Sequence, residues 1–137
     1  MNRNAVLIVD DDETDVLFLA DALKKTVPGL FVASVPNGQQ AIDYLAGRGK
    51  YADRTAWPFP THMFLDLKIP LVSGFQVLEW VRSQQQEIAQ LPVTVLSGSE
   101  LASDIERVQA LGADYRVKPI EYAALLALAR EYAQMFL

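Results

Sequence analysis

Five short, nearly continuous apolar runs alternate along this chain with five segments of helical period. The apolar runs span residues 5–9, 30–35, 63–65, 93–96 and 115–117, and such runs are typical of strands buried on both sides. The segments of helical period span residues 13–26, 38–46, 74–83, 100–111 and 120–136. Strict alternation of the two kinds predicts an α/β fold, in which a five-stranded parallel sheet carries helices on both faces.

Length and charge limit the classes of protein to which the chain can belong. Its 137 residues fit a single domain, residues 1–137, that is large enough to bury a core. A net charge of −5 argues against nucleic acid as a partner, because phosphate contacts need a basic surface. No apolar stretch approaches the roughly 20 residues that cross a bilayer, and the first run is too short for a signal peptide. We therefore expect a cytoplasmic protein that binds neither a membrane nor nucleic acid.

Polar side chains follow four of the five apolar runs. Asp10 and Asp11 end the first run, Asp66 the third, Ser97 the fourth and Lys118 the fifth. Because the carboxyl ends of parallel strands meet at one edge of the sheet, these residues are expected to form one site there.

The expected site combines three carboxylates, one hydroxyl and one ammonium. Three carboxylates at close range repel one another, and a hard divalent cation such as Mg²⁺ is the natural compensation. A phosphoryl group placed there would meet the metal, Lys118 and the hydroxyl of Ser97, which together neutralise its oxygens. A carboxylate nucleophile that forms an acyl phosphate fits these parts.

Four segments resemble, in order, those of the receiver domain of two-component response regulators, and the resemblance covers essentially the whole chain. They are Val9-Asp10-Asp11, Leu65-Asp66-Leu67-Lys68-Ile69-Pro70 with Gly74 following, Leu96-Ser97-Gly98, and Gly112-Ala113-Asp114-Tyr115-Arg116-Val117-Lys118-Pro119. The resemblance implies a doubly wound (βα)5, flavodoxin-like fold with the strand order 2-1-3-4-5.

The resemblance also implies a role for the acidic residues. Asp66 is the phosphoacceptor. Asp11 and Asp66 bind Mg²⁺ directly, together with the backbone carbonyl of Lys68, whereas Asp10 acts mainly through water. The side chain of Lys68 and Ser99 occupy positions that influence how quickly the acyl phosphate hydrolyses.

The remaining site residues take their roles from the same resemblance. Lys118 contacts the phosphoryl group, and a cis peptide bond before Pro119 is expected to direct it into the site. Ser97 hydrogen-bonds the phosphoryl group after transfer, and Tyr115 holds the aromatic position that moves inward as Ser97 shifts. Phosphorylation would thereby stabilise a minor arrangement of the fourth and fifth strand ends.

The function implied is that of a single-domain response regulator. Such a protein is not a conventional enzyme, since it catalyses its own phosphorylation from a sensor histidine kinase and its own dephosphorylation. No residues follow Leu137 to form a DNA-binding output domain, so we expect output through protein–protein contacts or through phosphate relay. The long loop over residues 48–60 is similar to that of stand-alone receivers paired with phytochrome-type kinases.

Two surfaces are candidates for partner binding. In receivers the face that carries Thr14, Asp15 and Phe18 meets the kinase. On the last helix, an apolar stripe suggests a homodimer. The stripe comprises Tyr122, Leu125, Ala129, Tyr132 and Phe136, with Leu128, Met135 and Leu137 partly outside it.

Three local expectations complete the description of the chain. His62 is expected on the surface. Ser99 is expected to cap the fourth helix. The aromatic side chains of the loop over residues 48–60 are expected to pack over the edge of the sheet.

Two alternatives stay open at this point. The segment Asp10-Asp11-Asp12-Glu13-Thr14 reads D-x-D-x-T after a hydrophobic strand, as in haloacid-dehalogenase-type phosphatases, where Asp10 would be the nucleophile. That family needs a further acidic pair, and only Glu121 and Glu131 follow the lysine strand, while Asp66 is left without a role. The second alternative is a receiver-like binding module that is never phosphorylated.

Overall fold

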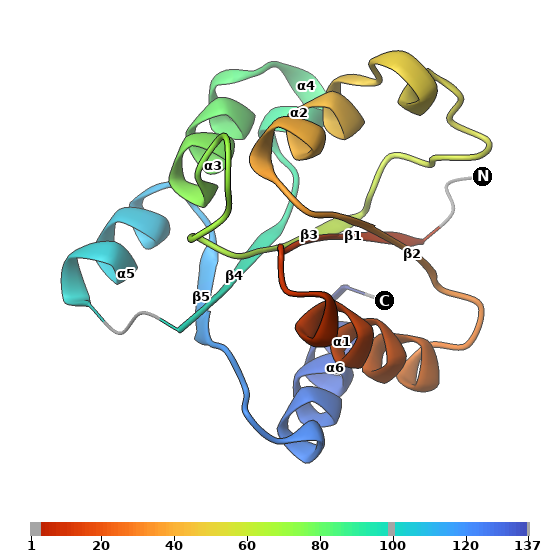
Figure 1. Cartoon of the computed structure of the whole chain (residues 1–137), viewed down its shortest axis with the longest axis vertical. Helices are drawn as coiled ribbons and strands as arrows, with labels where there is room; N and C mark the ends of the chain where they lie inside the picture. The colour runs from red at the N-terminus through yellow and green to blue at the C-terminus, as the bar shows by residue number, and fades with distance from the viewer. Residues whose placement is uncertain (1–3, 99–100, 137) are drawn as a thin grey trace.

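The computed structural model describes residues 4–98 and 101–136 and has three layers, with a sheet between two layers of helices (Figure 1). In chain order the elements are β1 (Ala5–Val9), α1 (Glu13–Thr26), β2 (Phe31–Val35), α2 (Gly38–Ala46), the 3-10 turn η1 (Gly49–Ala52), β3 (His62–Leu65), α3 (Gly74–Ser83), α4 (Gln86–Ala89), β4 (Val93–Ser97), α5 (Ala102–Ala110), β5 (Asp114–Val117) and α6 (Tyr122–Phe136). The predicted segments are thus confirmed to within two residues at each described end, and the short helix α4 is an addition.

The five strands form one parallel sheet in the order β2-β1-β3-β4-β5, which confirms the predicted order 2-1-3-4-5. In the register of the central strands, Val9 lies opposite both Val35 of β2 and Leu65 of β3. The carboxyl ends of β1 and β3 are therefore level with each other, and the residues that follow them emerge side by side.

Alternate residues of β1 serve two separate hydrophobic cores. Leu7 and Val9 point into a core formed with α2, α3 and α5, whereas Val6 and Ile8 point into a core formed with α1 and α6. In Figure 1, α1 and α6 lie together below the sheet, α2, α3 and α4 lie above it, and α5 lies at its left. Burial on both faces explains why the strands are nearly continuously apolar.

The histidine expected on the surface is buried. His62 is the first residue of β3, lies opposite Val6 and is only 1% exposed. Its Nε2 lies 2.8 Å from the hydroxyl oxygen of Thr94, and its ring contacts those of Phe64 and Tyr132. The prediction was wrong because the core accommodates this polar ring through its contacts with Thr94, Phe64 and Tyr132.

The long loop before β3 is packed as predicted. Tyr51 of η1 and Trp57 join Tyr44 of α2 in an aromatic cluster whose ring centroids lie 4.8 to 6.2 Å apart. The Tyr44 hydroxyl donates a hydrogen bond of 2.9 Å to the carbonyl of Pro58, and Phe59 packs against the same core. Aromatic burial therefore holds the loop in place.

The guanidinium of Arg82, near the end of α3, joins two turns at the amino end of the sheet. It donates to the carbonyls of Ala89 and Leu91 before β4, and to those of Leu111 and Gly112 before β5. The donor–acceptor distances run from 2.6 to 3.3 Å. One partly buried side chain thus fixes the starting points of both strands.

The last helix uses most of its apolar stripe in the core. Leu125, Ala129 and Tyr132 are buried, and so is Leu128, which was expected partly outside the stripe. That expectation was wrong because α6 packs along α1 as well as on the sheet, so its buried face is wider than one row. Met135 is 63% exposed, whereas Leu137 and the side chain of Phe136 lie outside the description.

Ser99, the predicted cap of the fourth helix, lies outside the described residues, and Leu101 occupies the N-cap position of α5. Across residues 4–98 and 101–136, no helix has both the length and the apolar character that a membrane span requires.

The buried state of His62 predicts a specific dependence of stability on pH. Desolvation lowers the pKa of His62 to about 4, whereas the unfolded chain has a pKa of about 6.5. Between these values the unfolded chain binds a proton that the folded chain does not, so acid favours unfolding. Lowering the pH from about 7.5 to about 5.5 should remove about 1 kcal/mol of stability through this residue.

The measurement is urea unfolding of the unsubstituted protein and of His62→Gln at both pH values. His62 is the only histidine of the chain, so the difference between the two proteins isolates its titration. An equal loss of stability in both proteins would contradict the assignment.

Candidate functional site

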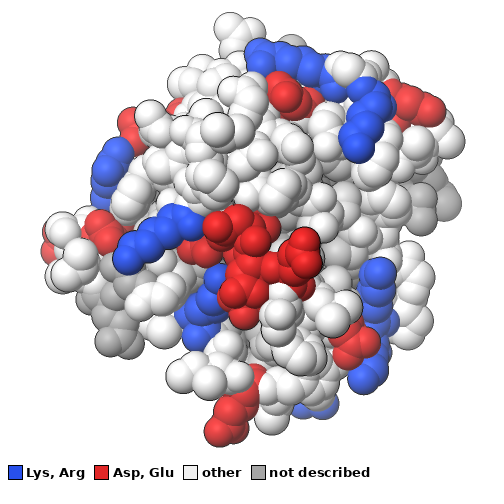
Figure 2. Space-filling view, viewed as in Figure 1, with Lys and Arg blue, Asp and Glu red and all other residues white. Residues whose placement is uncertain are grey.

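Three carboxylates converge at the carboxyl edge of the sheet. Asp10 and Asp11 follow β1, Asp66 follows β3, and one carboxylate oxygen from each lies within 4.8 Å of the others. Figure 2 shows acidic side chains gathered over the junction of β1 and α1, with basic side chains beside them. The structure thus brings together the three aspartates that the strand-end pattern predicted.

The ammonium of Lys118, which follows β5, lies among carboxylates from three elements. Its Nζ is 2.8 Å from Asp10 Oδ2, 2.8 Å from Asp15 Oδ2 and 3.1 Å from Asp66 Oδ2. Asp15 belongs to the first turn of α1, and its contact with Lys118 was not predicted. No pattern in the sequence indicated this contact, because it depends on the direction in which α1 leaves the sheet.

Burial and charge act against each other within this cluster. Burial is the largest influence on Asp10 and raises the pKa of its carboxyl, although hydrogen bonds from Lys118 and from the Asp12 amide oppose it. Burial also disfavours the charge on Lys118, but hydrogen bonds to Asp10 and Asp15 outweigh it and raise the pKa of the ammonium. Lys118 is therefore a permanent cation at neutral pH, and Asp10 gains from any further positive charge beside it.

Backbone amides orient two of the aspartates. The Asp12 amide donates a bond of 2.9 Å to Asp10 Oδ1, and the Lys68 amide donates a bond of 3.3 Å to Asp66 Oδ1. The side chain of Asp12 in turn accepts from the Asp15 amide and caps α1. The loops after β1 and β3 thus aim their carboxylates at the same point.

Gly74 allows α3 to begin directly against the backbone of Asp66. A Cβ atom at position 74 would lie 2.3 Å from the carbonyl oxygen of Asp66 and 2.6 Å from Cα of Leu67. The N-terminus of α3 is completed by Ser73, whose side chain forms a capping box with Gln76. Only a residue without a side chain fits between the helix and the strand end.

Ser97 and Tyr115 lie on the two strands nearest to Lys118. Ser97 is the last residue of β4, is buried, and accepts a 2.9 Å hydrogen bond at its carbonyl from the Lys118 amide. Tyr115, on β5, packs into the core on the side of α3. Its buried hydroxyl has no hydrogen-bond partner within the described part of the chain.

The peptide bond before Pro119 is not cis. Among residues 4–98 and 101–136 no cis bond occurs, so this expectation was wrong. Two kinds of contact direct Lys118 into the site instead. Its backbone amide donates a hydrogen bond to the carbonyl of Ser97, and carboxylates surround its ammonium.

The donor set fits a hard divalent cation. Asp10, Asp11 and Asp66 supply carboxylate oxygens, which are the ligands that Mg²⁺ prefers, and the exposed Asp11 leaves room for retained waters. Three carboxylates face one ammonium, so the cluster remains short of positive charge. A divalent cation would supply it.

The predicted partner surface lies beside this cluster on α1. Thr14 and Phe18 are exposed, and the ring of Phe18 contacts Tyr122 of α6 edge-on at 6.2 Å. Asp15 is half-buried because its carboxylate turns toward Lys118. Asp15 therefore belongs to the partner surface and also contacts Lys118 in the site.

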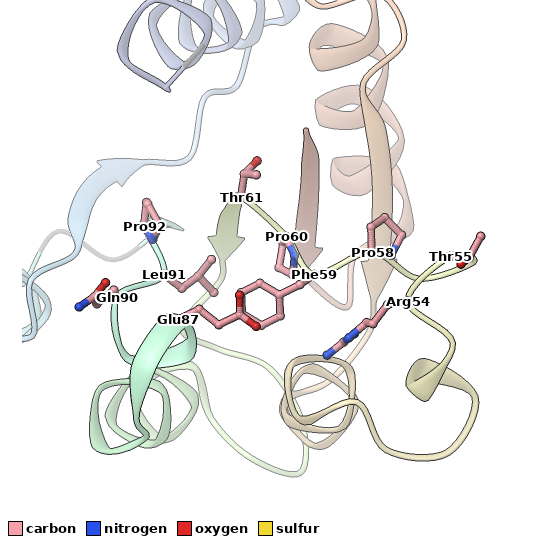
Figure 3. A pocket seen from close by; sticks show the side chains of 10 residues that line it. All are labelled: Arg54, Thr55, Pro58, Phe59, Pro60, Thr61, Glu87, Gln90, Leu91 and Pro92. Carbon is pink, nitrogen blue, oxygen red and sulfur yellow. The ribbon is translucent and has the colours of Figure 1, made fainter. Parts of the chain in front are cut away.

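A hollow of about 710 Å³ lies at the opposite end of the sheet, between the loop before β3 and the segment from α4 to β4 (Figure 3). Its one cationic lining residue, Arg54, donates to the carbonyls of Leu45 and Trp57. The guanidinium thus serves to hold the loop. No acidic cluster that could hold a metal lies there among the described residues.

Comparison with known proteins gives one family. A family model described as "Response regulator receiver domain" matches residues 6–130. The polar-differentiation response regulator DivK of Brucella anthropi is 26% identical over 129 residues, which cover 93% of this chain and 94% of DivK.

Solved structures agree closely with the fold. A response regulator in red light signaling of R. palustris has a TM-score of 0.87 at 30% identity, over 98% of this chain and 94% of that chain. The phosphorylated cyanobacterial phytochrome response regulator RcpA has a TM-score of 0.87 at 26% identity, with the same coverages. The bacteriophytochrome response regulator RtBRR has a TM-score of 0.79 at 33% identity, over 98% of this chain and 80% of that chain.

The close approach at Gly74 predicts a large effect of one methyl group. Gly74→Ala should destabilise the protein by about 1–3 kcal/mol, because the new Cβ must displace the backbone of Asp66 or the start of α3. The matched control is Gly98→Ala, where a Cβ meets no atom within 4 Å and the change should stay within about 0.5 kcal/mol. Urea unfolding measures both, and equal midpoints for the two variants would contradict the geometry.

Proposed function

Because this chain belongs to the response regulator receiver domain family, we propose that it accepts a phosphoryl group on Asp66 from a sensor histidine kinase. The single observation that carries this proposal is the ammonium of Lys118, 3.1 Å from Asp66 Oδ2 at the edge where three aspartates converge. The proposed protein is one receiver domain that acts in the cytoplasm through changes in protein–protein contacts.

Asp66 is the proposed nucleophile. One of its carboxylate oxygens attacks the phosphorus, and the bond from phosphorus to the imidazole nitrogen of the donor breaks with its electron pair leaving on that nitrogen. Water later attacks the same phosphorus, which releases inorganic phosphate and restores the carboxylate. In both steps the chain positions the reacting groups and neutralises the charge on the phosphoryl oxygens, as is usual in phosphoryl transfer.

Lys118 and Ser97 are proposed to bind the transferred group. The Lys118 ammonium already points at Asp66 and would form a charge-assisted bond to a phosphoryl oxygen. Ser97, at the end of the neighbouring strand, would donate its hydroxyl to a second oxygen. Since the Lys118 amide is bonded to the Ser97 carbonyl, the two residues would move together, with Tyr115 filling the space behind them.

Mg²⁺ is the proposed cofactor. Asp11 and Asp66 would bind it directly with the carbonyl of Lys68, and Asp10 would act mainly through water. The ion would supply charge neutralisation for the transferring phosphoryl oxygens. The residues of the chain hold the carboxylates apart and aim them, through the Asp12 and Lys68 amides.

The proposed donor is a phytochrome-type histidine kinase. Support comes from the likeness to three solved regulators of phytochrome or red-light pathways, two of them at 30% identity or more. The proposed docking surface is the face with Thr14, Asp15 and Phe18. A homodimer through α6 stays a prediction, and Met135 is an exposed large apolar residue that α6 would contribute to it.

The phosphatase alternative is set aside. It makes Asp10 the nucleophile and leaves Asp66 without a role, yet Asp66 lies within the carboxylate cluster and pairs with Lys118.

Mapping of the acyl phosphate tests the proposed function. Incubation with Mg²⁺ and acetyl phosphate should add one phosphoryl group to the protein, detected by intact mass and located on Asp66 by peptide mapping. Asp66→Asn should abolish the modification, because an amide is not a nucleophile toward phosphorus. Asp10→Asn is the matched control and should slow the reaction while the label stays on Asp66. A label on Asp10, or no label at all, would refute the assignment.

Removal of a metal ligand should weaken Mg²⁺ binding. Asp11→Asn is expected to raise the Mg²⁺ concentration needed to stabilise the protein by roughly tenfold, because a charged ligand is lost. Binding to the folded state raises Tm with Mg²⁺ concentration, so thermal unfolding at graded Mg²⁺ measures the affinity. The control is Glu13→Gln, which removes an equal charge outside the carboxylate cluster. Equal Mg²⁺ dependence in both variants would argue against a site at Asp11.

A further inference from the structure

Strand β2 forms one edge of the sheet, and within residues 4–98 and 101–136 only β1 pairs with it (Figure 1). The amide of Phe31 and the carbonyl of Val35 form hydrogen bonds on the β1 side of the strand. Because alternate residues of a paired strand turn their backbone groups to the same side, those of Val32 and Ser34 point away from the sheet. They offer N–H donors and carbonyl acceptors to a further strand.

The two edge strands differ in the charges that they carry. On β5, Asp114 and Arg116 form an ion pair of 3.0 Å. Strand β2 reads Phe-Val-Ala-Ser-Val and carries no charge. Charged side chains on an edge strand discourage pairing with another chain, so the β2 edge lacks a protection that the β5 edge has.

Beside the β2 edge, an open groove of about 450 Å³ separates β2 from α1. Four side chains of α1 line it in steps of four, three and four residues, and we call them the α1 stripe: Glu13, Leu17, Ala20 and Lys24. Leu17 is 65% exposed, and the two charged residues are exposed and form no ion pair within the described part of the chain. The stripe thus runs from an acid, across an exposed leucine, to a base.

The α1 stripe is complementary to itself. When two copies are related by a two-fold axis their α1 helices are antiparallel, and the spacing of the stripe is the same read from either end. Glu13 of one copy then meets Lys24 of the other, while Leu17 meets Ala20. An acid faces a base and a large side chain faces a small one, and each contact occurs twice.

The same two-fold relation suits the edge strands. With the axis beside Ala33, Val32 of one copy lies opposite Ser34 of the other, and such facing residues of antiparallel strands exchange backbone hydrogen bonds. Paired strands lie about 4.8 Å apart and packed helices about 8–10 Å apart, so helices above neighbouring strands can touch. The sheet would continue across both copies, with the two α1 helices side by side on one face.

We propose that a second copy of this chain binds at β2 and α1 and forms a two-fold dimer through strand pairing and the α1 stripe. This interface does not use α6, the helix for which the sequence predicts a dimer. Thr14 and Phe18 do not line the groove, so the proposed docking surface lies outside the interface. The inference goes beyond the proposed function and does not depend on phosphorylation.

Exchange of the charges at the two ends of the stripe tests the pairing. Glu13→Lys and Lys24→Glu each place like charges opposite one another, so each should weaken self-association of the full chain by roughly tenfold. When the two variants are mixed, a mixed dimer regains both ion pairs and should form about as readily as the unsubstituted dimer. Sedimentation velocity over a concentration series measures association. Met135→Lys, on the exposed side of α6, is the control and should leave the dimer intact.

Hydrogen exchange followed by NMR spectroscopy tests the strand pairing separately. The amides of Val32 and Ser34 should exchange at least about tenfold more slowly in the dimer than in Glu13→Lys alone, whereas those of β5 should be unaffected.

A chain that stays monomeric at about 1 mM would overturn the inference, because a weaker affinity does not indicate a specific interface. The same conclusion would follow from a dimer that both single variants leave intact, a mixture that associates no better than either variant, a dimer dissociated by Met135→Lys, or unprotected amides in β2. Recovery in the mixture separates a lost contact from a folding defect, which mixing cannot repair.

Discussion

The ammonium of Lys118 compensates the charge that the fold itself concentrates. A parallel sheet directs the residues after its strands to one edge, and here that edge receives Asp10, Asp11 and Asp66. Without a cation these carboxylates would repel one another and draw protons. The ion pairs of Lys118 with Asp10 and Asp66 join β1, β3 and β5, so the same contacts that balance the charge also hold the strand ends together.

The fold could be predicted because its signals are local and mutually consistent. Runs such as residues 5–9 have no polar residue until the strand ends, and Asn37 and Gly47 lie at the ends of α2, where their side chain and left-handed backbone complete the helix. The boundary of β3 was less clear, because His62 is polar by type but buried by position. A hydrogen bond to Thr94 from another strand makes that burial acceptable, and no local pattern announces a partner 32 residues away.

The site was predictable to the extent that strand ends determine it. Asp10, Asp11, Asp66 and Lys118 meet as the alternating pattern required. The contact of Asp15 with Lys118 depends instead on how α1 leaves the sheet, which Asp12 sets by capping the helix. Likewise, the role of Gly74 depends on a close approach between a helix and a strand end, which spacing in the sequence does not reveal.

Arg82 connects β4 and β5 at one end of the sheet. Its guanidinium fastens the turns before β4 and β5 at their amino ends, while the opposite ends of the same strands carry Ser97 and Lys118. A displacement of Ser97 or Lys118 would therefore move the carboxyl ends of these strands relative to amino ends that Arg82 holds. Helix α5 packs against β5 and is the part of the surface that such a displacement would reach.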